Sequence, residues 1–219
     1  MIPAPGERQE CILRVNQMVF SYPERQMFAQ WSRQFGAGLT WIRGHNGNGK
    51  STLLKLLGGA LVPHAGAIIA NGKDAVRDPL AYRQQVFWCG PGAIPFDHLS
   101  PLEYFGFMRG LYPGFDDTAL SSHVDAFSLR PHLRGRLCTL STGTQRKVWI
   151  SAALSAGTAV TLLDEPVNAL DAAAAMHLLA VLNERACDAG RACIVASHQA
   201  LGLAAQAATV IELSAAGVY

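Results

Sequence analysis

The feature that most constrains this chain is a glycine-rich segment at residues 44–51, which reads GHNGNGKS. An apolar run at residues 39–42 predicts a strand directly before it, and the apolar spacing of residues 50–57 predicts a helix directly after it. The segment fits the pattern G-x-x-x-x-G-K-S/T, in which glycines let backbone N–H groups surround phosphate oxygens at a helix N-terminus. In this pattern Lys50 reaches the β- and γ-phosphates, and the Ser51 hydroxyl binds Mg²⁺. The expected nucleotide contacts of this phosphate-binding loop, or P-loop, are Gly44, His45, Asn46, Gly47, Asn48, Gly49, Lys50, Ser51 and Thr52.

Composition and charge limit the class of protein further. With 219 residues, of which 50% are hydrophobic and 16% charged, the chain is long enough for one globular domain. A formal net charge of +2 without a dense run of Lys or Arg argues against nucleic acid as a partner. The five cysteines form no CxxC pair, which argues against a disulfide framework and against a zinc ribbon. Because no apolar stretch of about 18 residues is present and residues 1–10 lack the pattern of a signal peptide, we expect a cytosolic protein, either soluble or peripheral to a membrane.

The order of the expected elements indicates the fold class. Apolar runs at residues 159–163, 192–196 and 209–213 are typical of strands in a parallel sheet. The other expected elements are short antiparallel strands in residues 11–40, strands at 67–70 and 85–88, a helical insert in 101–128, and helices at 148–156 and 172–186. The aromatic residues of the insert form either its own core or a docking surface. This alternation predicts an α/β fold with a mostly parallel core sheet, an N-terminal antiparallel β subdomain and a helical insert. We expect a single domain over residues 1–219, with a helical subdomain at approximately residues 92–148.

Two carboxylates follow the expected buried strand at residues 159–163. Asp164 comes at the C-terminal end of this strand, where a P-loop protein holds its Mg²⁺. Glu165 is the next residue, so its side chain is expected to lie beyond the γ-phosphate and to polarise an attacking water as the general base. The alternative is that Asp164-Glu165-Pro166 only ends a strand.

Two further segments resemble motifs of the ATP-binding cassette (ABC) ATPases. Residues 140–145, LSTGTQ, are similar to the LSGGQ signature of that family and precede Asp164 as they do there. Residues 168–171, NALD, resemble the D-loop of the family. The resemblance covers roughly residues 12–213 and implies a P-loop NTPase fold that binds ATP and Mg²⁺.

Two single residues extend this resemblance. His198, which follows an expected buried strand, resembles the switch histidine of the family and would contact the γ-phosphate. Tyr22 falls where the family places an aromatic ring that stacks on adenine, with Phe20 as the alternative. By resemblance the catalytic residues are therefore Glu165, His198 and Lys50.

The resemblance also implies a head-to-tail dimer with two ATP molecules between the subunits. Ser141 and the Gly143 backbone would contact the γ-phosphate that the other subunit holds. Asn168 and Asp171 would lie at the dimer interface. The first expected partner is thus a second ATPase subunit, as a homodimer.

Two departures from the family pattern concern residues near these motifs. Thr142 and Thr144 stand where the signature usually has glycine and glutamine, which loosens the expected contact across the dimer. The family has a glutamine after the strand that ends at Cys89, and this chain reads Gly90-Pro91-Gly92-Ala93 there. Gln84 and Gln85 precede that strand and are poor substitutes.

The function implied by the resemblance is the ATPase subunit of an ABC transporter. Closing of the dimer around MgATP and reopening after hydrolysis would power a separate transmembrane permease, at the cytoplasmic face of the inner or plasma membrane. The short chain and residues 99–103, LSPLE, resemble exporter-type ATPases, including the haem-exporter group, so export is favoured. The alternatives are a soluble ABC ATPase that acts on ribosomes or DNA, and a nucleotide-binding subunit with weak hydrolysis.

Overall fold

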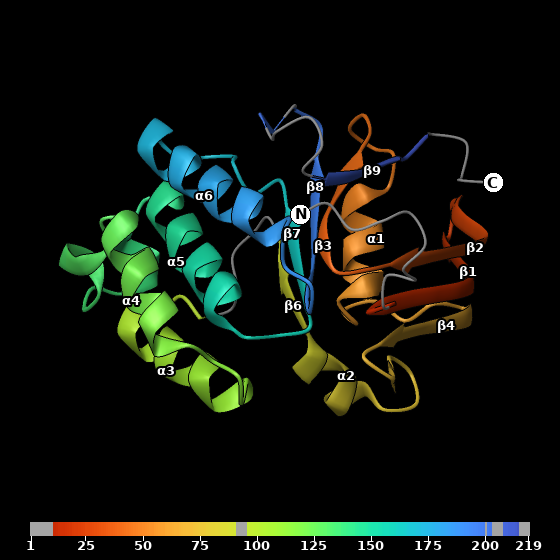
Figure 1. The fold of residues 1–219 in the computed structure, drawn as a ribbon, viewed down its shortest axis with the longest axis horizontal. Helices are drawn as coiled ribbons and strands as arrows, with labels where there is room; N and C mark the ends of the chain where they lie inside the picture. Colours follow the sequence, from red (N-terminus) through yellow and green to blue (C-terminus); the bar gives the residue numbers. More distant parts are fainter. Residues whose placement is uncertain (1–10, 91–95, 200, 203–207, 215–219) are drawn as a thin grey trace.

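The computed structural model describes residues 11–90, 96–199, 201–202 and 208–214, and its central element is a parallel sheet (Figure 1). The strand order in this sheet is β6-β7-β8-β3-β9, and every neighbouring pair is parallel. The five strands are β3 (Gly38–Arg43), β6 (Val86–Cys89), β7 (Val160–Asp164), β8 (Ala192–Ser197) and β9 (Ala208–Glu212). The expected α/β class with a mostly parallel core sheet is therefore confirmed.

An antiparallel sheet with the order β2-β1-β4-β5 packs beside it. Its strands are β1 (Leu13–Tyr22), β2 (Arg25–Phe35), β4 (Ala65–Ala70) and β5 (Lys73–Asp74). The expectation of short strands in residues 11–40 was wrong, because β1 and β2 are 10 and 11 residues long. Bulges explain the error: the β1–β2 register shifts between Val15 and Met18 and again by Phe20, and such shifts interrupt the alternation of apolar and polar residues.

The described residues also contain six α-helices and two short 3₁₀ helices, Arg130–His132 and Leu137–Thr139. The α-helices are α1 (Lys50–Leu57), α2 (Pro79–Gln85), α3 (Pro101–Leu111), α4 (Asp117–Ala126), α5 (Thr142–Ser155) and α6 (Ala172–Arg185). Helix α2 was not predicted, and Gln85 ends this helix rather than beginning a strand. Helix α5 begins at Thr142 rather than at Val148, because Ser141 caps its N-terminus by accepting a hydrogen bond from Thr144 N.

The parallel sheet is the middle layer between two apolar cores. On β7, Leu162 belongs to the core formed with α1 and the antiparallel sheet, whereas Leu163 belongs to the core formed with α3, α4, α5 and α6. Ile194 and Val195 of β8 divide in the same way, and all four side chains are fully buried. Burial on both faces explains why these strands appear in the sequence as continuous apolar runs.

The helical insert shares the core that α5, α6 and one face of the parallel sheet form. Tyr104, Phe105 and Met108 of α3 are buried in it, whereas Phe107 and Leu111 are 44% and 45% exposed. Helix α5 runs through residue 148 and packs against both α4 and the sheet. Within the described residues, none of the helices combines the length and the apolar character that a membrane-crossing segment requires.

Candidate nucleotide-binding site

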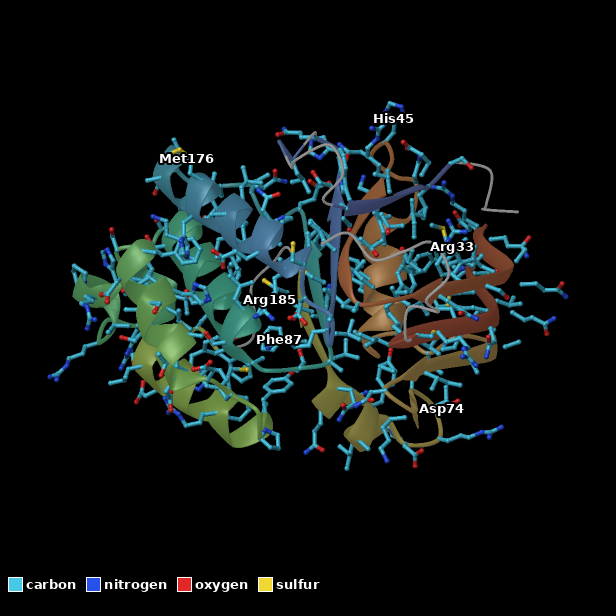
Figure 2. The ribbon with its side chains drawn as sticks, in the orientation of Figure 1. Arg33, His45, Asp74, Phe87, Met176 and Arg185 are labelled. Atoms are coloured by element: carbon cyan, nitrogen blue, oxygen red, sulfur yellow. The ribbon has the colours of Figure 1, made fainter. Side chains whose placement is uncertain are left out.

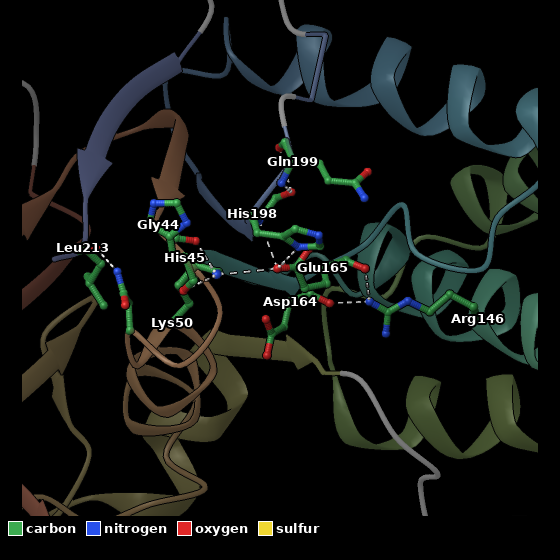
Figure 3. Close-up of polar contacts among 11 residues, drawn as sticks. Gly44, His45, Lys50, Arg146, Asp164, Glu165, His198, Gln199 and Leu213 are labelled. Atoms are coloured by element: carbon green, nitrogen blue, oxygen red, sulfur yellow. Dashed lines mark hydrogen bonds and ion pairs between the residues drawn. The ribbon is translucent and has the colours of Figure 1, made fainter. Parts of the chain in front are cut away.

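The glycine-rich loop connects β3 to α1 at the C-terminal edge of the parallel sheet (Figure 3). Gly47 and Gly49 have φ angles of 82° and 90°, a left-handed conformation that side chains other than glycine rarely adopt. Gly49 precedes α1 without a side-chain cap, and the first turn of α1 contains no acidic residue. The first N–H groups of α1 thus lack an internal partner, which is the arrangement that binds phosphate at a helix N-terminus.

Lys50 places a nearly buried ammonium group inside this loop. Only 5% of Lys50 is exposed, and its Nζ donates hydrogen bonds to the carbonyls of Gly44 at 2.6 Å and His45 at 3.2 Å. Glu165 Oε1 lies 3.7 Å from the same Nζ (Figure 3). Phosphate oxygens would replace these carbonyls as the partners of the ammonium group.

Glu165 and His198 meet beside Lys50, although they follow different strands. His198 donates from its backbone N to Glu165 Oε1 at 3.0 Å, and its ring Nδ1 lies 2.9 Å from the same oxygen. A neutral His198 with the proton on Nδ1 donates this bond and keeps Nε2 as an acceptor. The sequence placed Lys50, Glu165 and His198 in one catalytic group, and the fold brings all three together.

Asp164 offers a candidate magnesium ligand under the loop. Its side chain is fully buried, and within the described residues both carboxylate oxygens lack a hydrogen bond of normal geometry. Burial raises the pKa of this carboxyl, and the charge of Glu165 adds to the rise. The nearby Ser51 hydroxyl and the charges of Arg146 and Lys50 oppose this rise in pKa. The described residues contain no cluster of three or more His, Cys, Asp or Glu side chains that could enclose a metal. An orphaned carboxylate beside a hydroxyl fits Mg²⁺, which typically takes one or two protein ligands and completes its shell with water and phosphate oxygens.

Tyr22 lies at the entrance of a pocket of about 330 Å³ on this side of the loop. The pocket is lined by Tyr22, Arg25, Met27, Asn46, Gly47, Gly49, Lys50, Ser51, Thr52 and Glu165. Tyr22 is 41% exposed, and its hydroxyl lies 3.4 Å from Thr52 Oγ1. Phe20 is 6% exposed and packs edge-on against Tyr22, so Tyr22 is the ring that remains accessible to a base.

Two other loop residues face away from this pocket. The Asn48 amide donates to the carbonyl of Leu213 at 2.7 Å, just after β9. His45 is exposed, and with Asn48 and His198 it lines a neighbouring pocket of about 570 Å³ (Figure 2 shows His45 at the surface). The side chain of Asn48 thus ties the loop to the end of the sheet, whereas Gly44, whose Cβ would lie 2.6 Å from Leu213 O, permits the close approach of the two segments.

The signature-like residues form the N-terminus of α5, away from the pocket that Tyr22 lines. The Ser141 hydroxyl lies 2.9 Å from Thr144 Oγ1, so Thr144 supports the cap of the helix. A Cβ on Gly143 would lie 2.5 Å from the carbonyl of Ala169, so only glycine fits against this turn. Neither Ser141 nor Gly143 is among the described residues that line the pocket with Lys50.

Asn168 and Asp171 lie in the turn between β7 and α6. Both are exposed, and Asp171 caps α6 by accepting a hydrogen bond from Ala174 N. Lys147 of α5 forms an ion pair with Asp171 and, as the first cause, lowers the pKa of that carboxyl. The turn is therefore attached to α5 through Gly143 and Lys147.

Sequence reasoning missed three residues around the site. Arg25 and Met27 of β2 line the pocket of Tyr22, and Arg146 of α5 bonds to the backbone at Asp164 and Glu165. The available signal for Arg146 was a charged residue among the apolar positions of a helix. Residues 90–93 stand where the family has a glutamine. Gly90 is described by the structure, whereas Pro91, Gly92 and Ala93 lie outside the described residues.

Comparisons with known proteins identify relatives of this chain. A family model described as ABC transporter matches residues 35–168. The cytochrome c biogenesis ATP-binding export protein CcmA of Pseudomonas savastanoi pv. phaseolicola is 32% identical over 202 residues, which span 92% of this chain and 92% of that protein.

Two solved structures show the same fold. The ATP-binding subunit of an ABC transporter matches with a TM-score of 0.76 and 25% identity, over 85% of this chain and 79% of that chain. A bacterial Atm1-family ABC exporter with ATP bound matches with a TM-score of 0.77 and 21% identity, over 94% of this chain and 38% of that chain.

Proposed function

Because the chain belongs to the ABC transporter family and is an ATP-binding ATPase subunit of it, we propose that MgATP binding and hydrolysis at the site around Lys50 and Glu165 power a separate transmembrane permease. One observation carries the assignment of the site. Glu165 Oε1 lies 3.7 Å from Lys50 Nζ and 2.9 Å from His198 Nδ1, so a cation, a carboxylate and an imidazole meet at one edge of the sheet. The cation and the carboxylate supply the charge stabilisation and the base that phosphoryl transfer to water uses.

Glu165 is assigned as the general base. Its Oε1 is held by the backbone and ring of His198, and its Oε2 has no hydrogen-bond partner among the described residues. Glu165 accepts a proton from the attacking water, whereas Lys50 stabilises negative charge on the transferred phosphoryl group. His198 orients Glu165, and in its imidazolium form it also donates from Nε2 to the γ-phosphate.

The positions of the side chains also suggest which residues contact Mg²⁺ and the rest of ATP. Asp164 and Ser51 would hold Mg²⁺, which would neutralise negative charge on the phosphates. Tyr22 stacks on adenine at the entrance of the pocket. The backbone of residues 44–49 and the Thr52 side chain complete the contacts with ATP.

A head-to-tail homodimer completes each site. Ser141 and Gly143 lie on the N-terminus of α5 and outside the lining of their own pocket, so they are available to the ATP of a second subunit. The positive end of the α5 dipole favours this contact with the γ-phosphate. Asn168 and Asp171, exposed in the adjoining turn, are assigned to the same interface.

Export is the proposed direction of transport. The relative from Pseudomonas savastanoi, similar over most of both chains, is named as an export protein of cytochrome c biogenesis. We therefore place the chain with the haem-exporter group, as a peripheral subunit at the cytoplasmic face of the inner membrane. The soluble alternative that acts on ribosomes or DNA is not favoured by these relatives.

The partner is tested with tagged Glu165→Gln protein, captured from detergent-solubilised membranes of its host in MgATP. We expect a stoichiometric polytopic membrane protein, identified by mass spectrometry, because slow hydrolysis prolongs the ATP-bound complex. Capture with Lys50→Ala protein is the control, since loss of nucleotide binding should reduce the yield of this partner. Recovery of ribosomal or DNA-bound proteins in place of a permease would contradict the transporter assignment.

The adenine contact is tested by Tyr22→Ala. We expect ATP binding to weaken between about 5-fold and 150-fold, because stacking on an aromatic ring contributes about 1–3 kcal/mol per base. Tyr22→Phe keeps the ring and removes only the hydroxyl contact with Thr52, so it should keep nearly all of the affinity. Fluorescence titration with a labelled ATP measures both, and equal affinities for the wild-type and Tyr22→Ala proteins would rule out stacking by Tyr22.

A further inference from the structure

Arg146 is an almost fully buried cation whose role the nucleotide contacts do not explain. It lies on α5, and 5% of it is exposed. Its Nη1 donates to the carbonyl of Gly90 at 2.6 Å. Its Nη2 donates to the carbonyls of Asp164 and Glu165, the latter at 2.9 Å (Figure 3). Within the described part of the chain, it forms no ion pair with a carboxylate. Burying a guanidinium group without an ion pair is unfavourable, so this position is an unusual one for arginine in a helix.

The backbone that Arg146 holds is strained. Glu165 has a φ angle of 46°, which places a residue with a side chain in the left-handed region. Its N–H still donates to the carbonyl of Ala196 on β8 at 2.8 Å, so the left-handed conformation comes directly after the last bond to the sheet. Strained conformations of this kind persist only where the surrounding contacts determine them. The hydrogen bonds from Arg146 to the carbonyls of Asp164 and Glu165, one before and one after the Cα atom of Glu165, supply such contacts.

We propose that Arg146 is a positioning residue that fixes the backbone of Glu165 and so aims its carboxylate at the attacking water. This inference rests on the assignment of Glu165 as the general base. The guanidinium group suits the task, because it is planar and donates from two nitrogens in fixed directions to carbonyls of two separate segments. Arg146 itself touches neither nucleotide nor water in this role.

The same helix connects Glu165 to the proposed dimer contact. Arg146 follows the Ser141 cap by five residues on α5, a rise of about 7.5 Å. The next residue, Lys147, pairs with Asp171 in the turn after β7. Through these two side chains α5 holds both the general base and the turn beside it, so a displacement of the α5 N-terminus is transmitted to Glu165.

Arg146→Gln separates positioning from binding. Arg146 is absent from the described lining of the nucleotide pocket, so the variant should keep the KM for ATP within about threefold of the wild-type value. Its kcat should fall between about 10-fold and 100-fold, because a misplacement of about 1 Å at a catalytic group has effects of this size. Arg146→Lys retains the charge but cannot reach carbonyls of both segments, so its kcat should lie between those of the wild-type and Arg146→Gln proteins.

Arg185→Gln is the matched control. Arg185 also donates from a guanidinium nitrogen to a backbone carbonyl of α5, that of Leu154 at 3.0 Å, and Figure 2 shows it on the helical side of the sheet. Its loss should leave both kcat and KM unchanged. Thermal unfolding of every variant shows whether a lower rate comes from loss of the folded state. If Arg146→Gln does not fold, the kcat of Arg146→Lys tests the positioning role.

The outcomes distinguish two failures. Wild-type kcat in a folded Arg146 variant, or a KM that rises as much as kcat falls, would overturn the positioning role while the ATPase assignment stands. An equal fall of kcat in Arg185→Gln would show that any lost arginine bond to α5 has this effect, and it would also overturn the role. An inactive wild-type protein would overturn the assignment of Glu165, and this inference with it.

Discussion

Replacing Glu165 with glutamine is expected to lower the rate of ATP hydrolysis about 100-fold to 10,000-fold, the range that a general base typically contributes. Glutamine has nearly the same shape and still accepts the hydrogen bond from the His198 backbone to Oε1. It cannot take a proton from water, so the chemical step loses its base. Binding of MgATP should persist, because removal of the negative charge 3.7 Å from Lys50 Nζ leaves that ammonium group free for phosphate.

The variant should therefore accumulate a closed dimer in MgATP. Phosphate release measures the rate, and static light scattering measures the mass of the particle in solution. Glu184→Gln is the matched control, because Glu184 is exposed on α6 and should leave both quantities at wild-type values. Wild-type turnover in Glu165→Gln would remove Glu165 from the mechanism, and a monomer in saturating MgATP would contradict the dimer.

Replacing Lys50 with alanine is expected to weaken ATP binding about 10-fold to 150-fold. A hydrogen bond to a charged group contributes about 1.5–3 kcal/mol, which converts to this range of affinity. The loss occurs in a nearly buried position, where water cannot replace the ammonium group effectively. The alanine variant also leaves the negative charge of Glu165 without the positive charge of Lys50. Glu165 then repels the γ-phosphate, which weakens ATP binding further.

Lys55→Ala controls for the loss of a lysine from the same helix. Lys55 lies in the last turn of α1, at the other end from the loop, and should keep wild-type affinity. Isothermal titration calorimetry with MgATP compares the two variants, and thermal unfolding shows whether each is folded. Equal affinity of the wild-type and Lys50→Ala proteins would contradict the proposed contact of Lys50 with the phosphates.

The local elements of the site could be predicted because their residues lie close together in the sequence. The strand before Gly44 and the helix at residues 50–57 were placed correctly, since a buried strand, a glycine-rich turn and a leucine pattern each act over a few residues. The buried strands β7 and β8 were also recognised, as continuous apolar runs. The start of α5 was missed, because Thr142 and Gly143 are weak helix formers and only the Ser141 cap determines where the helix begins.

The long strands β1 and β2 and the helix α2 show a different limit. Bulges interrupt the alternation of β1 and β2, and the register that accommodates them is set by pairing across the sheet. Helix α2 has seven residues and only Tyr82 of it is buried, so its sequence carries little periodic signal. In both cases contacts with distant segments stabilise what the local pattern does not specify.

The sequence by itself determined which groups are assigned to the proposed site: a P-loop lysine, adjacent carboxylates after a buried strand, and a histidine after another. These are properties of residue type and spacing along one strand end or one turn. Only the tertiary structure decided that Glu165 Oε1 lies between Lys50 and His198, and that Arg146 holds the peptide at Asp164 and Glu165. The physical reason is that β3, β7 and β8 are neighbours in the parallel sheet, so their C-terminal ends meet although the residues are far apart in the chain.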